Sequence, residues 1–459
     1  MTPLDNTSSQ PGIFDRSALV RGLGEAAARL ADIVAMQAQD QQRSLYLVGG
    51  VLRDLLLGQR SADLDFVIES DASTFARGLQ KRYGGQVHAH QPFGTAKWSL
   101  SADSADRLGL PLADLPQHID FARARSETYA EPAALPDTKP GSIVDDMQRR
   151  DFSVNALALR LSPNAPYGQL LDACGGLQDL RNQQIRVLHD RSFIDDPTRI
   201  LRALRFTTRL NFKINAQTAV WLRDALPMLG RVSGARLRKE IDRIMVEKPA
   251  SEILLRLNDL GALKEIQPGF RPSKRLADDL KRAKEQEPPW QSADIDAPAL
   301  RWCLLLGAHE DTVARCIAKR LDLNRRQINS VSATCRILAI AEDLADPLRR
   351  PSEIAPRLEK LPPTALHAAW LLLHDSSSAQ ERLRLTMQRW RTIRPCTTGH
   401  DLRARGLPPG PHYKRILEQL RSAWIDGDVQ SCEAERALLQ RLLESGEYAQ
   451  GDQPSARLL

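Results

Sequence analysis

Two carboxylates stand one residue apart in a short apolar run, a spacing that is typical of a metal site. Asp63 and Asp65 lie in the stretch ADLDFVIES. If this stretch is a β-strand, both carboxylates point to one face, while Leu64 and Phe66 point the other way into a core. Two carboxylates side by side repel each other unless a cation lies between them. The pair therefore predicts a site for two divalent ions that hold the attacking and leaving oxygens of an in-line displacement. An exposed pair on an edge strand is the alternative.

A glycine pair precedes these aspartates, in the stretch LYLVGGVLRDLLLG. We expect a strand over Tyr46–Val48 and a short helix over Val51–Leu57, joined by the glycine turn. Glycines let backbone N–H groups approach a phosphate, and Arg53, one helical turn further on, could bind it. The stretch matches neither a Walker loop nor a GxGxxG fingerprint. Taken alone, the glycine pair favours a structural turn over a phosphate site.

A third set of polar residues recurs in the stretch FIDDPTRILRALRF. On a helical wheel they fill one half of the helix, and they are Asp196, Arg199, Arg202 and Arg205. The other half is apolar, with Ile200, Leu201 and Leu204. A carboxylate acceptor and a guanidinium donor can match the hydrogen-bonding edge of cytosine and, after a small reorientation, that of adenine. Asp196 also precedes a proline, as a helix N-cap does, so capping alone is an alternative. For the arginines, a solvated helix face is the alternative.

Two patterns along the chain indicate which elements position these residues. Short β-branched runs bounded by turns predict strands at Tyr46–Val48, Asp65–Ile68, Gln86–His90, Ala96–Leu100, Ile119–Ala124 and Leu170–Asp172. Helices are predicted over Val51–Leu57, Asp71–Tyr83 and Val154–Leu159. After Asp195 the pattern is helical almost to the end. The sequence therefore predicts an α+β head followed by a helical body.

Length and composition limit the classes of function. The 459 residues are enough for about three domains. Hydrophobic residues make up 42% and charged residues 26%, which is typical of soluble proteins. No apolar run approaches the roughly 20 residues of a membrane span, and the first residues do not read as a signal peptide. The six cysteines are scattered without a CxxC pair, which argues against a zinc site and is typical of a reducing cytoplasm.

The net charge of +7 is concentrated in one part of the chain. The segment from Asp195 to Lys248 contains 12 Lys and Arg residues and only 6 Asp and Glu residues. A basic stretch of this kind favours a polyanionic partner, nucleic acid before membrane, because no strongly amphipathic aromatic helix accompanies it. A solvated helical surface is the alternative.

Taken together, these motifs resemble those of the class II tRNA nucleotidyltransferase and bacterial poly(A) polymerase family, within the polymerase-β-like superfamily. Further stretches resemble family motifs in the expected order, namely RRDFSVNALAL, LLDACGGLQDL, FIDDPTRILRALRF and SGARLRKEI. A fainter likeness relates residues 399–417 to the tail motif of the tRNA-acting members, with Lys414 where the family usually has glycine. The main likeness covers roughly residues 45–250. It implies a polymerase-β-like nucleotidyltransferase head with a mixed or antiparallel sheet, followed by all-α neck, body and tail domains.

The resemblance also implies an activity, which is the addition of C, C and A to the 3′ end of tRNA from CTP and ATP with release of pyrophosphate. In the family the D-x-D pair binds Mg²⁺, which assigns Asp63 and Asp65 to the metals. The implied nucleotide-binding residues are Gly50 and Arg53 at the triphosphate, Arg149 and Asp151 at the nucleotide and ribose, and Asp196 and Arg199 at the base, supported by Arg202 and Arg205. Asp120 is a candidate third carboxylate. Ser126–Asp146 is a candidate mobile loop that repositions the base-reading groups.

The expected domains are a leader over residues 1–40, a catalytic head over 41–172, a neck with the recognition helix over 173–262, a body over 263–380 and a tRNA-binding tail over 381–459. The expected partners are tRNA, CTP and ATP in the cytoplasm, with no membrane and no protein partner. Enzymes that add only CC or only A share these motifs, as do poly(A) polymerases, so the motifs leave these activities open. A catalytically dead RNA-binding protein is disfavoured by the intact motifs, and a signal-nucleotide synthetase by the base-reading helix.

Overall fold

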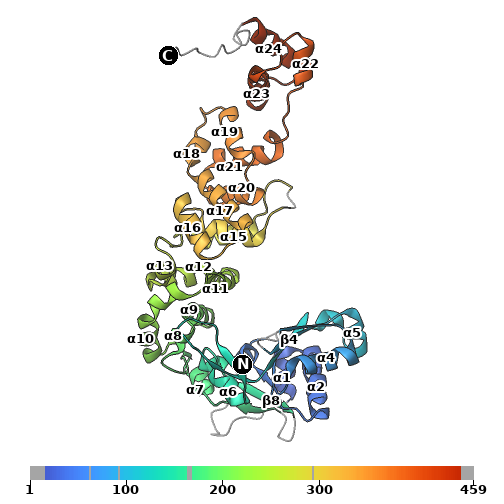
Figure 1. Ribbon diagram of the computed structural model, residues 1–459, viewed down its shortest axis with the longest axis vertical. Coiled ribbons are helices and arrows are strands. Elements are labelled where there is room, and N and C mark those ends of the chain that lie inside the picture. Colours follow the sequence, from blue (N-terminus) through green and yellow to red (C-terminus); the bar gives the residue numbers. More distant parts are fainter. Residues whose placement is uncertain (1–15, 61–63, 91–93, 163–167, 292–293, 446–459) are drawn as a thin grey trace, which may run out of the picture. The chain divides into compact units, whose positions relative to one another are not determined.

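The computed structural model describes residues 16–60, 64–90, 94–162, 168–291 and 294–445 (Figure 1). The chain forms two compact units, one of Met1–Pro249 with Asp259–Ile266 and one of Ala250–Asn258 with Gln267–Leu459. The finer boundaries expected for leader, head, neck, body and tail stay predictions. Within the described ranges, no helix is both long enough and apolar enough to cross a membrane.

In its described part, the first unit is built on a seven-stranded sheet of order β3-β4-β5-β2-β1-β8-β9. The strands are β1 (Leu45–Val48), β2 (Asp65–Ile68), β3 (Gln86–His90), β4 (Thr95–Ser99), β5 (His118–Arg123), β8 (Ala158–Ser162) and β9 (Gln169–Leu171). Neighbouring strands run antiparallel except β2 and β5, which run parallel. The mixed sheet confirms the predicted α+β class.

One face of this sheet is closed by α4 (Ala72–Tyr83), which packs on β3, β4 and β5. Phe75 of α4 meets Phe121 of β5 edge to face with 5.5 Å between ring centroids. Phe121 in turn stacks on Phe66 of β2 at 5.6 Å. Because side chains alternate along a strand, Asp65 faces away from this aromatic core. The core thus fixes which face of β2 presents a carboxylate.

The predicted helix over Val154–Leu159 is wrong. A 3-10 turn over Ser153–Asn155 leads into β8, which lies between β1 and β9. In β8, Ala158, Leu159 and Leu161 are all buried. A central strand covered on both faces has a continuous apolar run, and periodicity cannot distinguish such a run from a buried helix.

Residues 16–40, which the sequence analysis assigned to a leader, form α1 (Arg16–Leu23) and α2 (Glu25–Asp40). Helix α2 lies against β8 and α4 (Figure 1). It buries a stripe of small and branched apolar side chains, including Leu30 and Val34. These two helices therefore belong to the packed first unit.

The segment Ser126–Asp146, which was expected to be a mobile loop, contains regular structure. The strands β6 (Arg125–Thr128) and β7 (Asp137–Pro140) pair as an antiparallel hairpin, and α6 (Ile143–Gln148) follows. The strands of this hairpin are largely polar and stand apart from the main sheet, so they lack the apolar alternation from which strands are predicted. Whether the hairpin moves stays a prediction.

The rest of the first unit is mainly helical. Its helices are α3 (Gly50–Leu56), α5 (Ala102–Leu108), α7 (Gly176–Arg181), α8 (Ser192–Asp195), α9 (Thr198–Leu210), α10 (Ala216–Asp224), α11 (Gly234–Val246) and α13 (Ala262–Ile266). Short 3-10 turns lie at Leu112–Asp114 and Leu226–Arg231, and β10 (Gln184–Ile185) pairs with β11 (Lys213–Ile214). Helix α9 contains the predicted arginines Arg199, Arg202 and Arg205, begins shortly after Asp196 in the chain, and is packed against α11.

In its described residues, the second unit consists of helices joined by loops, with no strand. Its helices are α12 (Ala250–Asp259), α14 (Leu276–Glu285), α15 (Ala297–Leu306), α16 (Asp311–Arg320), α17 (Arg325–Leu338), α18 (Ala341–Ala345), α19 (Pro351–Leu358), α20 (Pro363–Leu372), α21 (Ser377–Leu385), α22 (Gly399–Ala404), α23 (Pro411–Asp426) and α24 (Cys432–Glu444), with a π-helical turn at Thr386–Trp390. One apolar cluster surrounds Trp390, and a smaller one joins Leu402, Ile416, Leu420 and Leu439 of the last three helices.

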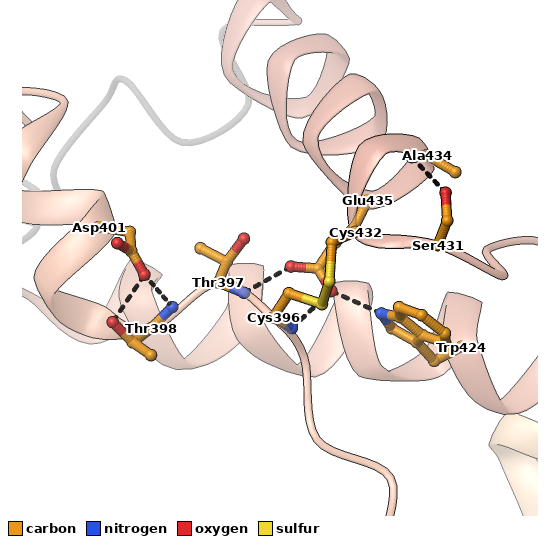
Figure 2. Close-up of a disulfide and its surroundings, with 9 residues drawn as sticks. All are labelled: Cys396, Thr397, Thr398, Asp401, Trp424, Ser431, Cys432, Ala434 and Glu435. Atoms are coloured by element: carbon orange, nitrogen blue, oxygen red, sulfur yellow. Dashed lines mark hydrogen bonds between the residues drawn. A yellow bond between two sulfur atoms is a disulfide. The ribbon is translucent and has the colours of Figure 1, made fainter.

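A disulfide closes the end of the second unit, which the scattered cysteine spacing did not predict. Cys396 lies just before α22 and Cys432 begins α24, with 5.8 Å between their Cα atoms (Figure 2). The fully buried Glu435 accepts hydrogen bonds from the backbone N–H groups of Cys396 and Thr397 at 2.8 and 2.6 Å, and from Trp424 Nε1 at 2.5 Å. Despite its burial, these donors hold the pKa of Glu435 below its ordinary value. The bridge and the carboxylate together tie α22–α24 into one substructure.

Replacing Cys396 and Cys432 by serine should therefore destabilise the last three helices. The bridge closes a segment with a sequence separation of 36 residues. Loop-closure entropy for that length corresponds to about 4 kcal/mol of unfolding free energy. We expect a lower unfolding midpoint for the double variant, and no change for Cys316→Ser, which removes an exposed free thiol. Thiol titration of the unfolded, unreduced protein should count four reactive thiols. A count of six would show that the bridge does not form.

Candidate active site

The glycine turn joins β1 directly to α3. Gly49 has a φ of +84°, which favours glycine, and α3 begins at Gly50. A Cβ atom on Gly49 would lie 3.2 Å from Arg150 Nη1 and 3.9 Å from Asp65 Oδ2. The bare backbone of the turn therefore runs beside the carboxylate of Asp65, as predicted, and beside the guanidinium of Arg150, which was not predicted.

Arg53 lies behind this turn and is 2% exposed. Its Nε donates to Asp54 Oδ1 at 2.8 Å and its Nη1 donates to Asn155 Oδ1 at 2.6 Å. A Cβ atom on Gly50 would lie 3.3 Å from Arg53 Nη2. Burial lowers the pKa of Arg53, and the carboxylate of Asp54 opposes that shift. The guanidinium thus supports the turn from inside, with Nη2 nearest to the turn.

The carboxylate of Asp65 has a second carboxylate beside it. Asp65 on β2 is paired in register with Asp120 on the parallel strand β5, so the two side chains project from the same face of adjacent strands. Asp120 is half-exposed, with Lys97 Nζ at 3.5 Å and His118 Nε2 at 3.6 Å. The predicted partner Asp63 lies outside the described residues. Two adjacent carboxylates are oxygen donors of the type that hard divalent cations take, so the residues present fit a metal site.

The two arginines of the RRD motif share one buried carboxylate. Asp146 of α6 is fully buried, and its Oδ1 accepts from Arg149 Nε and Nη2 at 2.9 and 2.6 Å. Its Oδ2 accepts from Arg150 Nη2 at 2.9 Å. Arg149 Nη1 also donates to Glu127 Oε1 of the β6–β7 hairpin at 3.1 Å. The motif arginines are therefore held in place from α6 and from the hairpin.

The aspartate of the same motif forms a buried ion pair with the recognition helix. Asp151 Oδ2 accepts from Arg202 Nε and Nη2 at 2.8 and 2.6 Å, while its Oδ1 accepts from Asn155 Nδ2 at 3.0 Å. Burial alone would raise the pKa of Asp151, but the charge of Arg202 and these hydrogen bonds outweigh it and lower the pKa to about 2. Both oxygens of Asp151 thus have protein partners.

Asp196, at the start of α9, uses one carboxylate oxygen for all its described contacts. Its Oδ1 accepts from the backbone N–H of Thr198 at 3.0 Å, the hydroxyl of Thr198 at 2.5 Å and Arg236 Nη2 at 2.7 Å. Within the described residues, Oδ2 of Asp196 has no hydrogen bond in this network. Asp196 also lines a cleft in the first unit. Helix capping and base reading are therefore compatible in one side chain.

The arginines of α9 do not form a solvated face. Arg199 is 5% exposed and donates to Ser192 Oγ at 3.0 Å and to the carbonyl oxygen of Arg149 at 2.7 Å. Arg205 is equally buried and donates to Glu240 Oε2 of α11 at 3.1 Å. The guanidinium groups of Arg53, Arg202 and Arg205 all lie over the ring of Phe206, between 5.1 and 5.4 Å from its centroid. The alternative of a solvated helix face is therefore wrong.

These residues line a cleft of about 820 Å³ in the first unit. The lining includes the glycine turn, Asp65, the RRD motif, the polar side of α9, and residues of α11 and of the β6–β7 hairpin. Its described side chains include 11 basic and 5 acidic ones. Such an excess of positive charge inside a cleft attracts polyanions such as triphosphates and nucleic acid backbones. The predicted nucleotide-binding residues and Asp65 all line this cleft, while Asp120 lines an adjoining pocket that also contains Asp65.

Several residues that line or support the cleft were missed because their signals are weak in a sequence. Asp146 stands three and four residues before the RRD arginines, a spacing that places them together on a helix end. Arg236 and Glu127 reach the cleft from segments distant in the sequence, and the ring of Phe206 is masked by the apolar pattern of α9. Only the spacing of Asp146 could have been read in advance.

Known proteins resemble this chain over most of its length. The sequence model of one protein family, the poly A polymerase head domain, matches residues 45–186. A second family model, described as the probable RNA and SrmB-binding site of polymerase A, matches residues 211–273. An A-adding tRNA nucleotidyltransferase of Halalkalibacterium halodurans is 33% identical over 91% of this chain and 90% of its own length. A CC-adding tRNA nucleotidyltransferase of Deinococcus radiodurans is 30% identical over 87% of this chain and 89% of its own.

A solved structure agrees with these sequence likenesses. The Thermotoga maritima CCA-adding enzyme complexed with tRNA-CCA is 26% identical, covers 95% of this chain and all of its own, and superposes with a TM-score of 0.65. The fold is thus a polymerase-β-like head followed by a mostly helical remainder. A nucleotidyltransferase of this kind implies the use of a divalent metal. Fold, cleft and relatives lead to one conclusion, that the chain is an enzyme of the tRNA nucleotidyltransferase family, whose members include CCA-adding, CC-adding and A-adding enzymes and whose head domain is that of the poly(A) polymerases.

Proposed function

We propose that this enzyme adds a single adenylate to tRNA that ends in CC, using ATP and releasing pyrophosphate. The proposed specificity for A addition rests on the likeness to the A-adding enzyme of Halalkalibacterium halodurans, which extends over nine-tenths of both chains. The tip of the β6–β7 hairpin lies close to the base-reading residues, because Ala133 N donates to the carbonyl oxygen of Ile194 at 3.1 Å. An enzyme that adds only A would need no movement of this hairpin between C and A addition.

Addition of the whole CCA sequence, the expectation from the motifs, is the second candidate. It is favoured by the likeness to the Thermotoga maritima CCA-adding enzyme at 26% identity over nearly the whole chain. Both candidates use the same residues for the transfer itself, and they differ only in which bases the cleft accepts.

We assign the residues as follows. Asp65, with the predicted Asp63, would hold Mg²⁺, and Asp120 is adjacent as a third carboxylate. When bound, the metal would lower the pKa of the tRNA 3′-hydroxyl and neutralise the departing pyrophosphate. The backbone of Gly50 and the guanidinium of Arg53 would bind the triphosphate.

The residues that would read the base lie on α9 or beside it. Asp196 and Arg199 line the cleft and would read the base edge there. Arg149 lines the same cleft and would bind the nucleotide there. Asp151, Arg202 and Arg205 hold these groups in position through buried ion pairs.

Extension of defined tRNA substrates tests the proposal. Transcripts that end at the discriminator base, in C or in CC would each be incubated with Mg²⁺ and labelled ATP or CTP. We expect ATP to extend only the CC transcript, by one residue, and CTP to extend none. Incorporation of CTP into the two shorter transcripts would favour the CCA candidate. Long adenylate tails on unrelated RNA would contradict both.

A further inference from the structure

The tip of the β6–β7 hairpin is fixed to the recognition helix by a single arginine of α11. Arg236 Nη1 donates to the carbonyl oxygen of Ala133 at 2.8 Å. Arg236 Nη2 donates to Asp196 Oδ1 at 2.7 Å. These partners stand 103 and 40 residues away in the sequence. One guanidinium thus joins three elements at the position where the base would be read.

The geometry of this contact limits how the carboxylate of Asp196 can turn. Its Oδ1 accepts from Arg236 on one side and from the two donors of Thr198 on the other. A guanidinium is planar and holds its donors in a fixed fork, so it sets the orientation of the acceptor and not only its distance. With Oδ1 fixed in this way, the direction of the second oxygen, Oδ2, is fixed as well.

The same contact sets the position of the hairpin tip. Ala133 has a φ of +63°, an unfavourable value for alanine, which its two hydrogen bonds to Arg236 and Ile194 compensate. Two residues further on, Leu135 is 64% exposed and, with Pro136, lines the polar cleft. An exposed leucine in a cleft of charged side chains is an apolar surface on which a flat nucleobase can pack.

We propose that Arg236 is a specificity-determining positioning residue, which orients Asp196 toward the base edge and places Leu135 against the base face. The inference rests on the proposed function, because it assumes that the cleft selects a nucleotide by its base. In this arrangement Arg236 acts through Asp196 and the hairpin without contacting the nucleotide. Loss of the fork should therefore relax base selection more than it slows the transfer of the preferred nucleotide.

The test compares variants of the full-length protein on tRNA that ends in CC. Arg236→Lys keeps the charge but cannot bridge two acceptors in a fixed fork, and Leu135→Ser removes the apolar surface. Arg238→Ala removes a charge from the same helix outside the cleft lining and serves as the matched control. For each protein, kcat and KM would be measured with ATP, CTP, GTP and UTP, and circular dichroism melting would verify folding.

We expect Arg236→Lys to reduce the ratio of kcat/KM for the preferred nucleotide over the rejected ones by about 10-fold to 100-fold, as expected for the loss of a hydrogen bond to a charged group. Leu135→Ser should raise the KM of the preferred nucleotide, and Arg238→Ala should keep wild-type selectivity. Combined with Asp196→Asn, the Arg236→Lys change should add little further loss of selectivity, because both act on the same contact.

Two results would overturn the inference. One is unchanged selectivity in a folded Arg236→Lys protein, and the other is an equal loss of kcat/KM for all four nucleotides, which would indicate a general role in stability or phosphate attraction. The nucleotide preference of the wild-type enzyme is measured in the same series. A wild type that does not prefer ATP would contradict the A-adding proposal without deciding the role of Arg236. The change in selectivity remains defined whichever nucleotide the wild type prefers.

Discussion

An Asp65→Ala variant should lose at least about 1000-fold in kcat for nucleotide transfer, since a metal-held charge stabilises such a transition state by several kcal/mol. Its binding of tRNA should be close to that of the wild type, because the phosphate backbone is bound by basic side chains. Asp65 begins β2 beside the glycine turn and in register with Asp120, and its neighbour Phe66 fixes its direction through the aromatic core. Removing the carboxylate leaves that core in place.

The measurement is single-turnover transfer to tRNA that ends in CC, with tRNA affinity measured in parallel by filter binding. Asp65→Asn keeps the size of the side chain and should be nearly as inactive, because an amide is a poor ligand for Mg²⁺. Asp103→Ala removes a carboxylate from the surface helix α5, where the side chain is 57% exposed, and should leave transfer unchanged. Substantial turnover by either Asp65 variant would contradict the metal assignment.

The strands that surround the site were predictable because their signals are local. A short apolar run that ends in two glycines predicts β1 and the turn, and the alternation around Phe66 predicts the direction of Asp65. Strand β8 was wrongly predicted as a helix because it lies inside the sheet, where both of its faces are apolar and the alternation is lost. The hairpin was not predicted for the opposite reason, since its strands are polar and lie outside the main sheet.

The supporting contacts of the site could not be predicted because they join residues distant in the sequence. The wheel of α9 correctly placed Arg199, Arg202 and Arg205 on one side, but it could not show that this side packs against carboxylates of α11 and the RRD motif. In the same way, the bridge between Cys396 and Cys432 depends on how α22–α24 fold together. Patterns in one segment predict which residues belong to the site, and tertiary contacts decide whether each binds the ligand or supports a neighbour.

The Asp151→Asn variant should show how much stability the buried ion pair with Arg202 contributes. The pKa of Asp151 is lowered to about 2 from an ordinary value of 3.8. A group with a lowered pKa stabilises the folded state above its unfolded pKa, and that contribution is lost as the pH falls through the folded pKa. The shift corresponds to about 2.5 kcal/mol at pH 7 and about 1.3 kcal/mol at pH 3.

Urea unfolding of wild type and variant between pH 3 and pH 7 would measure this directly. We expect Asp151→Asn to lower the free energy of unfolding at pH 7, and the difference between the proteins to shrink by about half toward pH 3. Replacing both partners, as in Asp151→Asn with Arg202→Gln, should recover part of the loss, because the single variant leaves the charge of Arg202 buried without its partner. A difference that is constant with pH would mean that the carboxylate contributes only through its shape and hydrogen bonds. Since Arg202 lies one turn beyond Arg199 on α9, a loosened ion pair would also let the recognition helix shift, and base selection should weaken together with stability.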